Sequence, residues 1–306
     1  MKIDPDFNSD CRDCMINIFP DMKQVILKKI ESPSDDDDRN NSRATKLAKE
    51  LGVDYCNTIF EACTNNYRSR EITCHSDLHA FNILVERKPD VQHLENFGPN
   101  GTVVICDWEM AMCGPIGLDV GRIYSIPVAS ILAHAVSGNE DAVQGLREFL
   151  SEFWIIYSSA MKSAGKDEDF LCKSYRNAMA FLGWKLLGIY TFDWFVPFLP
   201  VNENDVEAFK DSLCVVSLKL MRWGFAGYEE GLSVAELQSR LHRTIDEELS
   251  IIQSQKRRTR GRRSSVLRET NRRVSDAFIG MGSMTSSAIA AIFESEFADQ
   301  VVEKNL

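Results

Sequence analysis

Four side chains that carry oxygen occur in two short motifs, and their chemistry suits phosphoryl transfer. Asp77 and Asn82 belong to the motif His-Ser-Asp-Leu-His-Ala-Phe-Asn, and Asp107 and Glu109 to the motif Asp-Trp-Glu. Asp77 can orient a hydroxyl group and accept its proton. The other three offer hard oxygen ligands suited to Mg²⁺, which shares its coordination shell with phosphates. The set therefore predicts transfer of a phosphoryl group from ATP to an alcohol, with Mg²⁺ as cofactor.

The elements that must position these motifs are two short strands. Residues 83–85 are an apolar run directly after Asn82, and residues 102–106 are a β-branched run directly before Asp107. The residues between them are polar and rich in turn formers, which predicts an extended hairpin loop. If the strands pair, both motifs lie at the same end of the hairpin.

The motifs also resemble a known group of enzymes. His-x-Asp-Leu-His-x-x-Asn, followed by a strand and Asp-x-Glu, resembles the aminoglycoside phosphotransferase and choline kinase superfamily. The continuation Gly-Pro-Ile-Gly-Leu-Asp-Val-Gly at 114–121 is most similar to the S-methyl-5-thioribose kinases. The resemblance covers residues 71–253. It implies a protein-kinase-like fold, of which this is the C-terminal lobe, mainly α with a short β-hairpin.

The resemblance implies a function and a role for each matching residue. It implies ATP-dependent phosphorylation of a sugar hydroxyl, with 5-methylthioribose the leading substrate and methionine salvage the pathway. Asp77 is the implied catalytic residue, and Asn82, Asp107 and Glu109 are the implied metal ligands. The spacing of Asp77 and Asn82 also matches the catalytic loop of protein kinases.

Four further residues complete the expected site. Asp119 is expected to accept hydrogen bonds from the backbone of the catalytic loop, although it could instead cap a helix near residue 120. His75 is expected to anchor the same loop. His79 is a candidate substrate contact or scaffold residue. Arg222 matches the first of two substrate-binding arginines in the thioribose kinases, but it could equally be a surface residue.

Departures from the family pattern leave other functions open. Trp223 stands where the second arginine is expected, and Ser76 and Phe81 replace smaller residues. Another small alcohol, such as choline, homoserine or an aminoglycoside, is therefore an alternative substrate. A pseudokinase or interaction module without catalytic activity is the alternative from a different class.

Residues 1–70 predict a helical segment with an acidic loop at 32–38 rather than a nucleotide-binding lobe. Gly52 is the only glycine before residue 75, so there is no glycine-rich phosphate loop there, and no Val-Ala-x-Lys strand occurs. We therefore expect a catalytic lobe whose N-terminal lobe is missing. Residues 120–253 show helical periodicity and predict a helical bundle.

The amino-acid composition limits the expected cellular location and binding partners of the protein. No apolar run approaches eighteen residues, so no transmembrane segment is expected. Nine cysteines, an odd number, favour reduced thiols and a cytoplasmic protein. The net charge of −10 argues against nucleic-acid binding. A second copy of the chain, forming a homodimer, is a further candidate partner.

The residues after 253 differ in character from the rest of the chain. Residues 256–275 contain nine basic residues and one acidic residue. The sequences Arg-Arg-Ser-Ser at 262–265 and Arg-Arg-Val-Ser at 272–275 match sites modified by basophilic protein kinases. Residues 254–306 are therefore expected to form a basic, disordered regulatory tail. A nuclear-localisation signal, a contact with anionic membranes and an extension without function are the alternatives.

Overall fold

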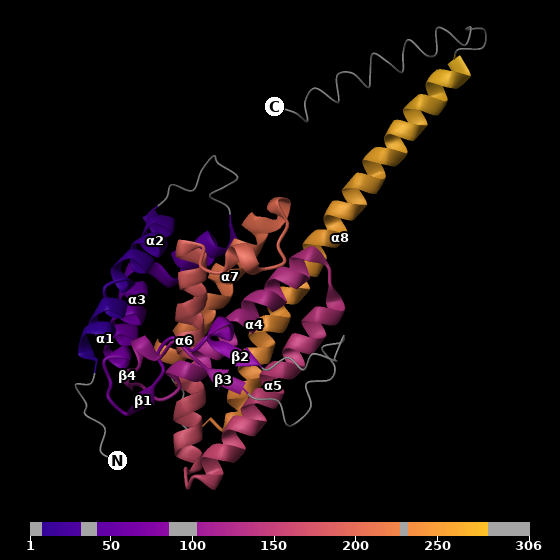
Figure 1. Cartoon of the computed structure of the whole chain (residues 1–306). Helices are drawn as coiled ribbons and strands as arrows, with labels where there is room; N and C mark the ends of the chain where they lie inside the picture. Colours follow the sequence, from indigo (N-terminus) through magenta and orange to yellow (C-terminus); the bar gives the residue numbers. More distant parts are fainter. Residues whose placement is uncertain (1–7, 32–41, 86–102, 227–231, 281–306) are drawn as a thin grey trace. The chain divides into compact units, whose positions relative to one another are not determined.

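Helices make up most of the protein, as the helical periodicity predicts. The structure is a computed structural model and describes residues 8–31, 42–85, 103–226 and 232–280 (Figure 1). Its α-helices are α1 (Ser9–Ile16), α2 (Phe19–Glu31), α3 (Arg43–Tyr67), α4 (Leu118–Ser137), α5 (Glu140–Ser163), α6 (Glu168–Phe192), α7 (Val206–Met221) and α8 (Val234–Gly280). A mainly helical architecture with a small β component is thus confirmed.

The β component consists of two antiparallel pairs. Strand β2 (Ile83–Val85) pairs with β3 (Val103–Ile105), with Ile83 opposite Ile105, which is the hairpin that the sequence predicts. Strand β1 (Ile72–Cys74) pairs with β4 (Met112–Gly114), a pair that the sequence analysis does not anticipate. The connecting residues 86–102, predicted as an extended loop, lie outside the described residues.

Contacts divide the chain into two units, Met1–Gln253 and Ser254–Leu306. The segments 1–70 and 71–253 share the first unit, because α2 and α3 contribute to the same hydrophobic cluster as β1, β4, α6 and α7. The acidic loop at 32–38 lies outside the described residues.

The basic tail differs from its prediction as a disordered segment. Helix α8 continues to Gly280, so residues 254–280 are helical. The reason is that this stretch contains no proline and is rich in arginine, a good helix former, with Gly261 its only glycine before the end of the helix. Residues 281–306 lie outside the described residues.

Helix α6 occupies the centre of the first unit, and its residues 177–189 are buried on all sides. It supplies Tyr175 and Leu182 to one hydrophobic cluster and Phe181 and Trp184 to the other. Helix α7 lies directly against it, since a Cβ atom on Gly183 would come within 2.8 Å of the Ser217 carbonyl oxygen. The absence of a side chain at 183 therefore permits the close approach of the two central helices.

Helix α4 is the one helix in the described ranges that is long and apolar enough to cross a membrane by length and composition. Within the protein, 61% of its most apolar window is buried. Such burial is typical of a core helix that passes the same test, so α4 is weak evidence for a membrane span.

Candidate functional site

The loop between β1 and η2 (Ala80–Asn82) carries Asp77 and is held by Asp119 from the first turn of α4. The Asp119 carboxylate accepts hydrogen bonds from the backbone N–H groups of His75 (2.8 Å) and Ser76 (2.9 Å). Ser76 has a φ of 67°, a left-handed conformation that is uncommon for residues other than glycine. Burial raises the pKa of Asp119 despite the two bonds. This arrangement is the one that the resemblance implies for Asp119.

His75 links the Asp77 loop to the strand before Asp107. Its Nδ1 atom accepts a hydrogen bond from the backbone N–H of Asp77 (3.3 Å), so Nε2 carries the proton and donates to the Cys106 carbonyl oxygen (2.7 Å). The imidazole also lies against the Trp108 ring, 4.6 Å between centroids. With both nitrogens engaged, His75 acts here as a scaffold residue.

Two buried cations and a histidine surround the Asp77 carboxylate. Arg122 Nη1 lies 2.6 Å and Lys185 Nζ 3.6 Å from Oδ1, and His79 Nε2 lies 3.5 Å from Oδ2. Arg122 is fully buried and Lys185 is 4% exposed. Arg122 comes from α4 and Lys185 from the centre of α6, so Asp77 joins the loop to two core helices.

These neighbours set the ionisation of the group. Burial alone would raise the pKa of Asp77, but the hydrogen bond from His79 and the two cations outweigh it and hold the pKa well below its usual range. Burial, aided by the nearby Arg122 charge, lowers the pKa of Lys185 to about 7. Asp77 is therefore ionised at neutral pH, and Lys185 loses its proton more readily than an exposed lysine does.

Hydrogen bonds connect Asp77 to the candidate metal ligands. Asn82 donates from its side-chain amide to the Asp77 carbonyl oxygen (2.9 Å). The Asn82 carbonyl oxygen accepts from the backbone N–H of Cys106 (3.0 Å), and Asp107 follows with a left-handed φ of 65°. Asp107 and Glu109 flank Trp108 with exposed side chains. The hairpin end thus gathers both motifs, as predicted.

The donor set has a chemistry compatible with Mg²⁺, although the structure does not identify a metal centre. Asn82, Asp107 and Glu109 offer hard oxygen atoms, and the exposure of Asp107 and Glu109 would let the ion keep several water ligands. Within the described ranges, no group of three or more histidine, cysteine, aspartate or glutamate residues is arranged to hold a metal ion. The magnesium site therefore stays a prediction.

Arg222 is not brought to Asp77 by any hydrogen bond or ion pair that the described residues form. It lies at the start of the π-helical turn η7 (Arg222–Ala226), is exposed, and places its guanidinium 5.7 Å from the centre of the Tyr55 ring. A π-helical turn changes the direction of successive side chains relative to an α-helix. The role of Arg222 as a substrate contact therefore stays a prediction.

Arg122 and Lys185 are functional candidates that the sequence analysis missed. Each lies within a strongly apolar helix, where an isolated cation is unusual unless it is paired. The contrast between these charged residues and their apolar neighbours was the signal available in the sequence. The carboxylate that pairs with both residues is far away in the sequence and is identified only by the fold.

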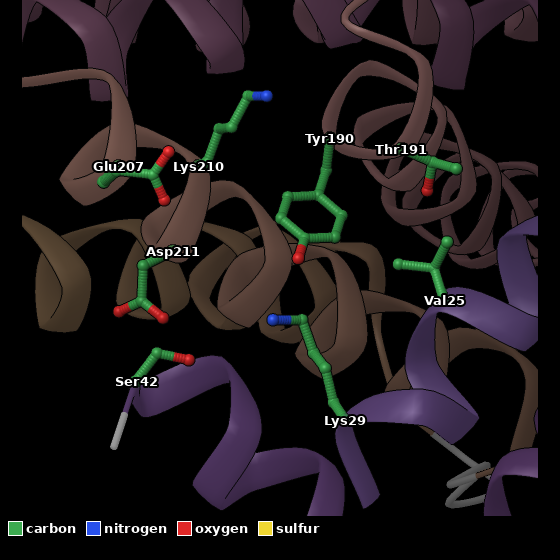
Figure 2. A pocket seen from close by; sticks show the side chains of 8 residues that line it. All are labelled: Val25, Lys29, Ser42, Tyr190, Thr191, Glu207, Lys210 and Asp211. Atoms are coloured by element: carbon green, nitrogen blue, oxygen red, sulfur yellow. The ribbon is translucent and has the colours of Figure 1, made fainter. Parts of the chain in front are cut away.

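A pocket of about 630 Å³ lies between α2, α6 and α7, with Ser42 at its edge (Figure 2). None of the predicted site residues lines it. The Lys29 side chain points toward the Tyr190 hydroxyl, with which it forms a hydrogen bond. Lys210 also lines the pocket and pairs with Asp193 at 2.5 Å.

Comparison with known proteins adds no family assignment. No family model matches the chain, and no curated protein shows significant similarity to it. The function is therefore inferred from the residues and the geometry described above.

Proposed function

We propose that the protein transfers the terminal phosphoryl group of ATP to a hydroxyl group of a small molecule. The observation that carries this proposal is the chain of hydrogen bonds from Asp77 through Asn82 to Cys106, the residue before Asp107. It supports an arrangement in which an ionised carboxylate and the candidate metal ligands lie at one end of a hairpin. This is the division of labour that phosphoryl transfer requires.

Each residue has a defined task in this mechanism. Asp77 accepts a hydrogen bond from the substrate hydroxyl and orients its oxygen toward the terminal phosphate of ATP; it takes the hydroxyl proton as the new O–P bond forms and ADP leaves. Asn82, Asp107 and Glu109 would hold Mg²⁺, which neutralises phosphate charge when it is bound. Lys185 presents a buried cation beside Asp77, where negative charge develops on the transferred group.

The charges favour a neutral or anionic alcohol over a cationic one. Arg122 and Lys185 both lie beside Asp77, so the carboxylate is already compensated and does not attract a third cation. This disfavours choline and aminoglycosides. A sugar hydroxyl, with 5-methylthioribose and methionine salvage as the leading substrate and pathway from the resemblance, is compatible with it.

The setting of the reaction is part of the same proposal. Seven cysteines in the described residues are free, which is compatible with a reducing compartment, so we place the protein in the cytoplasm. A homodimer and phosphorylation of the basic segment 256–275 by a basophilic kinase also belong to the proposal. A non-catalytic binding module is the second candidate, favoured because Arg122 and Lys185 contact Oδ1 of Asp77 and His79 contacts Oδ2.

The test is a phosphoryl-transfer assay of the full chain with Mg-ATP and 5-methylthioribose. Asp107→Asn should lower turnover by about 10² or more, since it removes charge that neutralises the phosphates. Asp54→Asn, at an exposed aspartate on α3, is the matched control and should keep the parent rate.

The same assay separates the two candidate functions. Choline, homoserine and an aminoglycoside serve as competing acceptors. A folded parent protein that transfers phosphate to none of these alcohols, and that Mg-ATP does not stabilise against heat, would refute the enzyme and favour the binding module.

A further inference from the structure

The turn that follows α6 has an unusual backbone. Asp193 and Phe195 have φ values of 57° and 62°, both in the left-handed region. Residues other than glycine adopt this region infrequently, and a bulky residue such as phenylalanine is an outlier there. A turn that only ended the helix would be better served by glycine or asparagine. The conformation at 193–195 therefore calls for interactions that hold it and for a use of the side chains that it presents.

Three side-chain contacts hold the turn. Lys210 of α7 forms an ion pair with Asp193. The Trp194 ring lies against α6 at Gly188, where an added Cβ atom would come within 2.5 Å of the ring. Lys185 Nζ lies 4.8 Å from the centre of the same ring. The turn is thus fixed both at its first residue and at its centre.

The turn presents Phe195 to two other phenylalanines. Phe195 stacks on Phe81 at 5.4 Å between centroids and an interplanar angle of 25°, and Phe81 contacts Phe198 at 5.3 Å. Phe81 is 48% exposed and Phe198 is 73% exposed. Buried cores rather than surfaces are the usual place for stacked aromatic rings of this size. We call Phe81, Phe195 and Phe198 the aromatic shelf.

Two side chains join the aromatic shelf to Asp77. His79 contacts the Asp77 carboxylate through Nε2 and lies against the Phe195 ring at 5.0 Å. Lys185 contacts the same carboxylate and lies 5.6 Å from the Phe195 ring. The shelf is therefore one side chain away from the carboxylate to which we assign the substrate hydroxyl.

We propose that the aromatic shelf selects the alcohol substrate and that Lys210 is a positioning residue that acts on it through Asp193. This inference rests on the proposed function. The shelf accepts an uncharged or anionic alcohol that carries a flat or apolar group, which lies on the exposed rings while its hydroxyl reaches Asp77. Cationic groups are disfavoured because the ammonium of Lys185, 5.6 Å from the Phe195 ring, repels a second positive charge beside it.

The test measures binding and turnover separately in the full chain. The probes are 5-methylthioribose, ribose, which lacks the apolar group, and choline, and binding is measured by calorimetry. The variants are Phe81→Ala, Phe195→Ala, Lys210→Ala and Lys210→Arg. Phe149→Ala, at an exposed phenylalanine of α5, is the matched control. Circular dichroism and a urea midpoint establish that each variant is folded.

We expect the parent to bind 5-methylthioribose about tenfold or more tightly than ribose, because an apolar contact of this size contributes about that factor. Phe195→Ala and Phe81→Ala should reduce the ratio of the two affinities to below about threefold. Lys210→Ala should reduce it too, and Lys210→Arg should restore it, which a merely structural role would not predict. Phe149→Ala should leave it unchanged.

Two results overturn the inference: an affinity ratio that the folded shelf variants leave unchanged, or a parent that binds neither uncharged probe. A shelf-dependent ratio without phosphoryl transfer would support the shelf and refute the proposed reaction. Phosphoryl transfer with an affinity ratio that the shelf variants leave unchanged would support the proposed reaction and refute the role of the shelf.

Discussion

Replacing Asp77 should destabilise the fold, apart from any effect on catalysis. Asp77→Ala removes the carboxylate that compensates Arg122, which is fully buried, and Lys185, which is nearly so. Breaking a buried ion pair by removing one partner typically costs about 3–5 kcal/mol. Lys185 can relieve part of this by losing its proton, since burial already lowers its pKa to about 7. Arg122 cannot lose its proton, so we expect the free energy of unfolding to fall by about 3 kcal/mol.

Urea denaturation followed by circular dichroism measures this loss in the free energy of unfolding. The second variant is Asp77→Ala combined with Lys185→Met, which removes one of the two uncompensated cations. Because neighbouring residues are coupled, the combination should recover about 1 kcal/mol or more relative to the sum of the single effects. Asp54→Ala, at an exposed site, should change stability by less than about 0.5 kcal/mol.

A loss below about 1 kcal/mol for Asp77→Ala, without coupling to Lys185, would refute the assignment of Asp77 as the counter-charge of the buried cations. The expected loss also affects kinetic experiments. Reduced turnover in Asp77→Ala does not by itself identify a catalytic group, because part of the sample would be unfolded under mild stress. Asp107, which is exposed, is the better residue for the functional test.

Three other predictions concern pH, a second ion-pair cluster and a close contact. The folded pKa of Lys185 lies below its unfolded value, so this residue contributes stability that grows as pH rises from about 7 to 10, and the pH slope of stability should be more positive in the parent than in a folded Lys185→Met variant; equal slopes in the two proteins would contradict this. Arg43→Ala leaves Glu248 buried without its cation and should lower the free energy of unfolding, measured by urea denaturation, by about 3–5 kcal/mol. Lys219→Ala, which breaks a surface ion pair, should lower it by less than about 1 kcal/mol. Gly188→Ala should displace the tryptophan ring packed there, shift its fluorescence and destabilise the protein by about 1–3 kcal/mol; an unchanged spectrum would argue against the contact.

The hairpin at the candidate site was predictable because its signals are local. An apolar run follows Asn82, a β-branched run precedes Asp107, and turn-forming residues separate them. The helices were predictable from their periodicity for the same reason. The β1–β4 pair was not, because strands of three residues at 72–74 and 112–114 carry too little alternation to be recognised.

The charged part of the site depends on tertiary structure and was only partly predictable. Arg122 and Lys185 are separated from Asp77 by 45 and 108 positions, so only the packing of α4 and α6 reveals that one carboxylate compensates both. Arg222 was assigned by resemblance, yet its position at a π-helical turn directs it onto Tyr55. Sequence motifs identify which groups could react, whereas the buried counter-charges follow from the fold.

The central position of α6 has a consequence for synthesis of the protein in the cell. Both hydrophobic clusters need residues from α6 and from α7, so neither can close until the ribosome has translated through Met221. At typical rates of about 5–20 residues per second, α6 remains uncovered on its α7 side for a few seconds after Phe192 is added. During that interval the nascent chain exposes an apolar helix, which makes it prone to aggregation. Slow codons placed between residues 193 and 221 should therefore lower the yield of folded protein more than slow codons placed after residue 253.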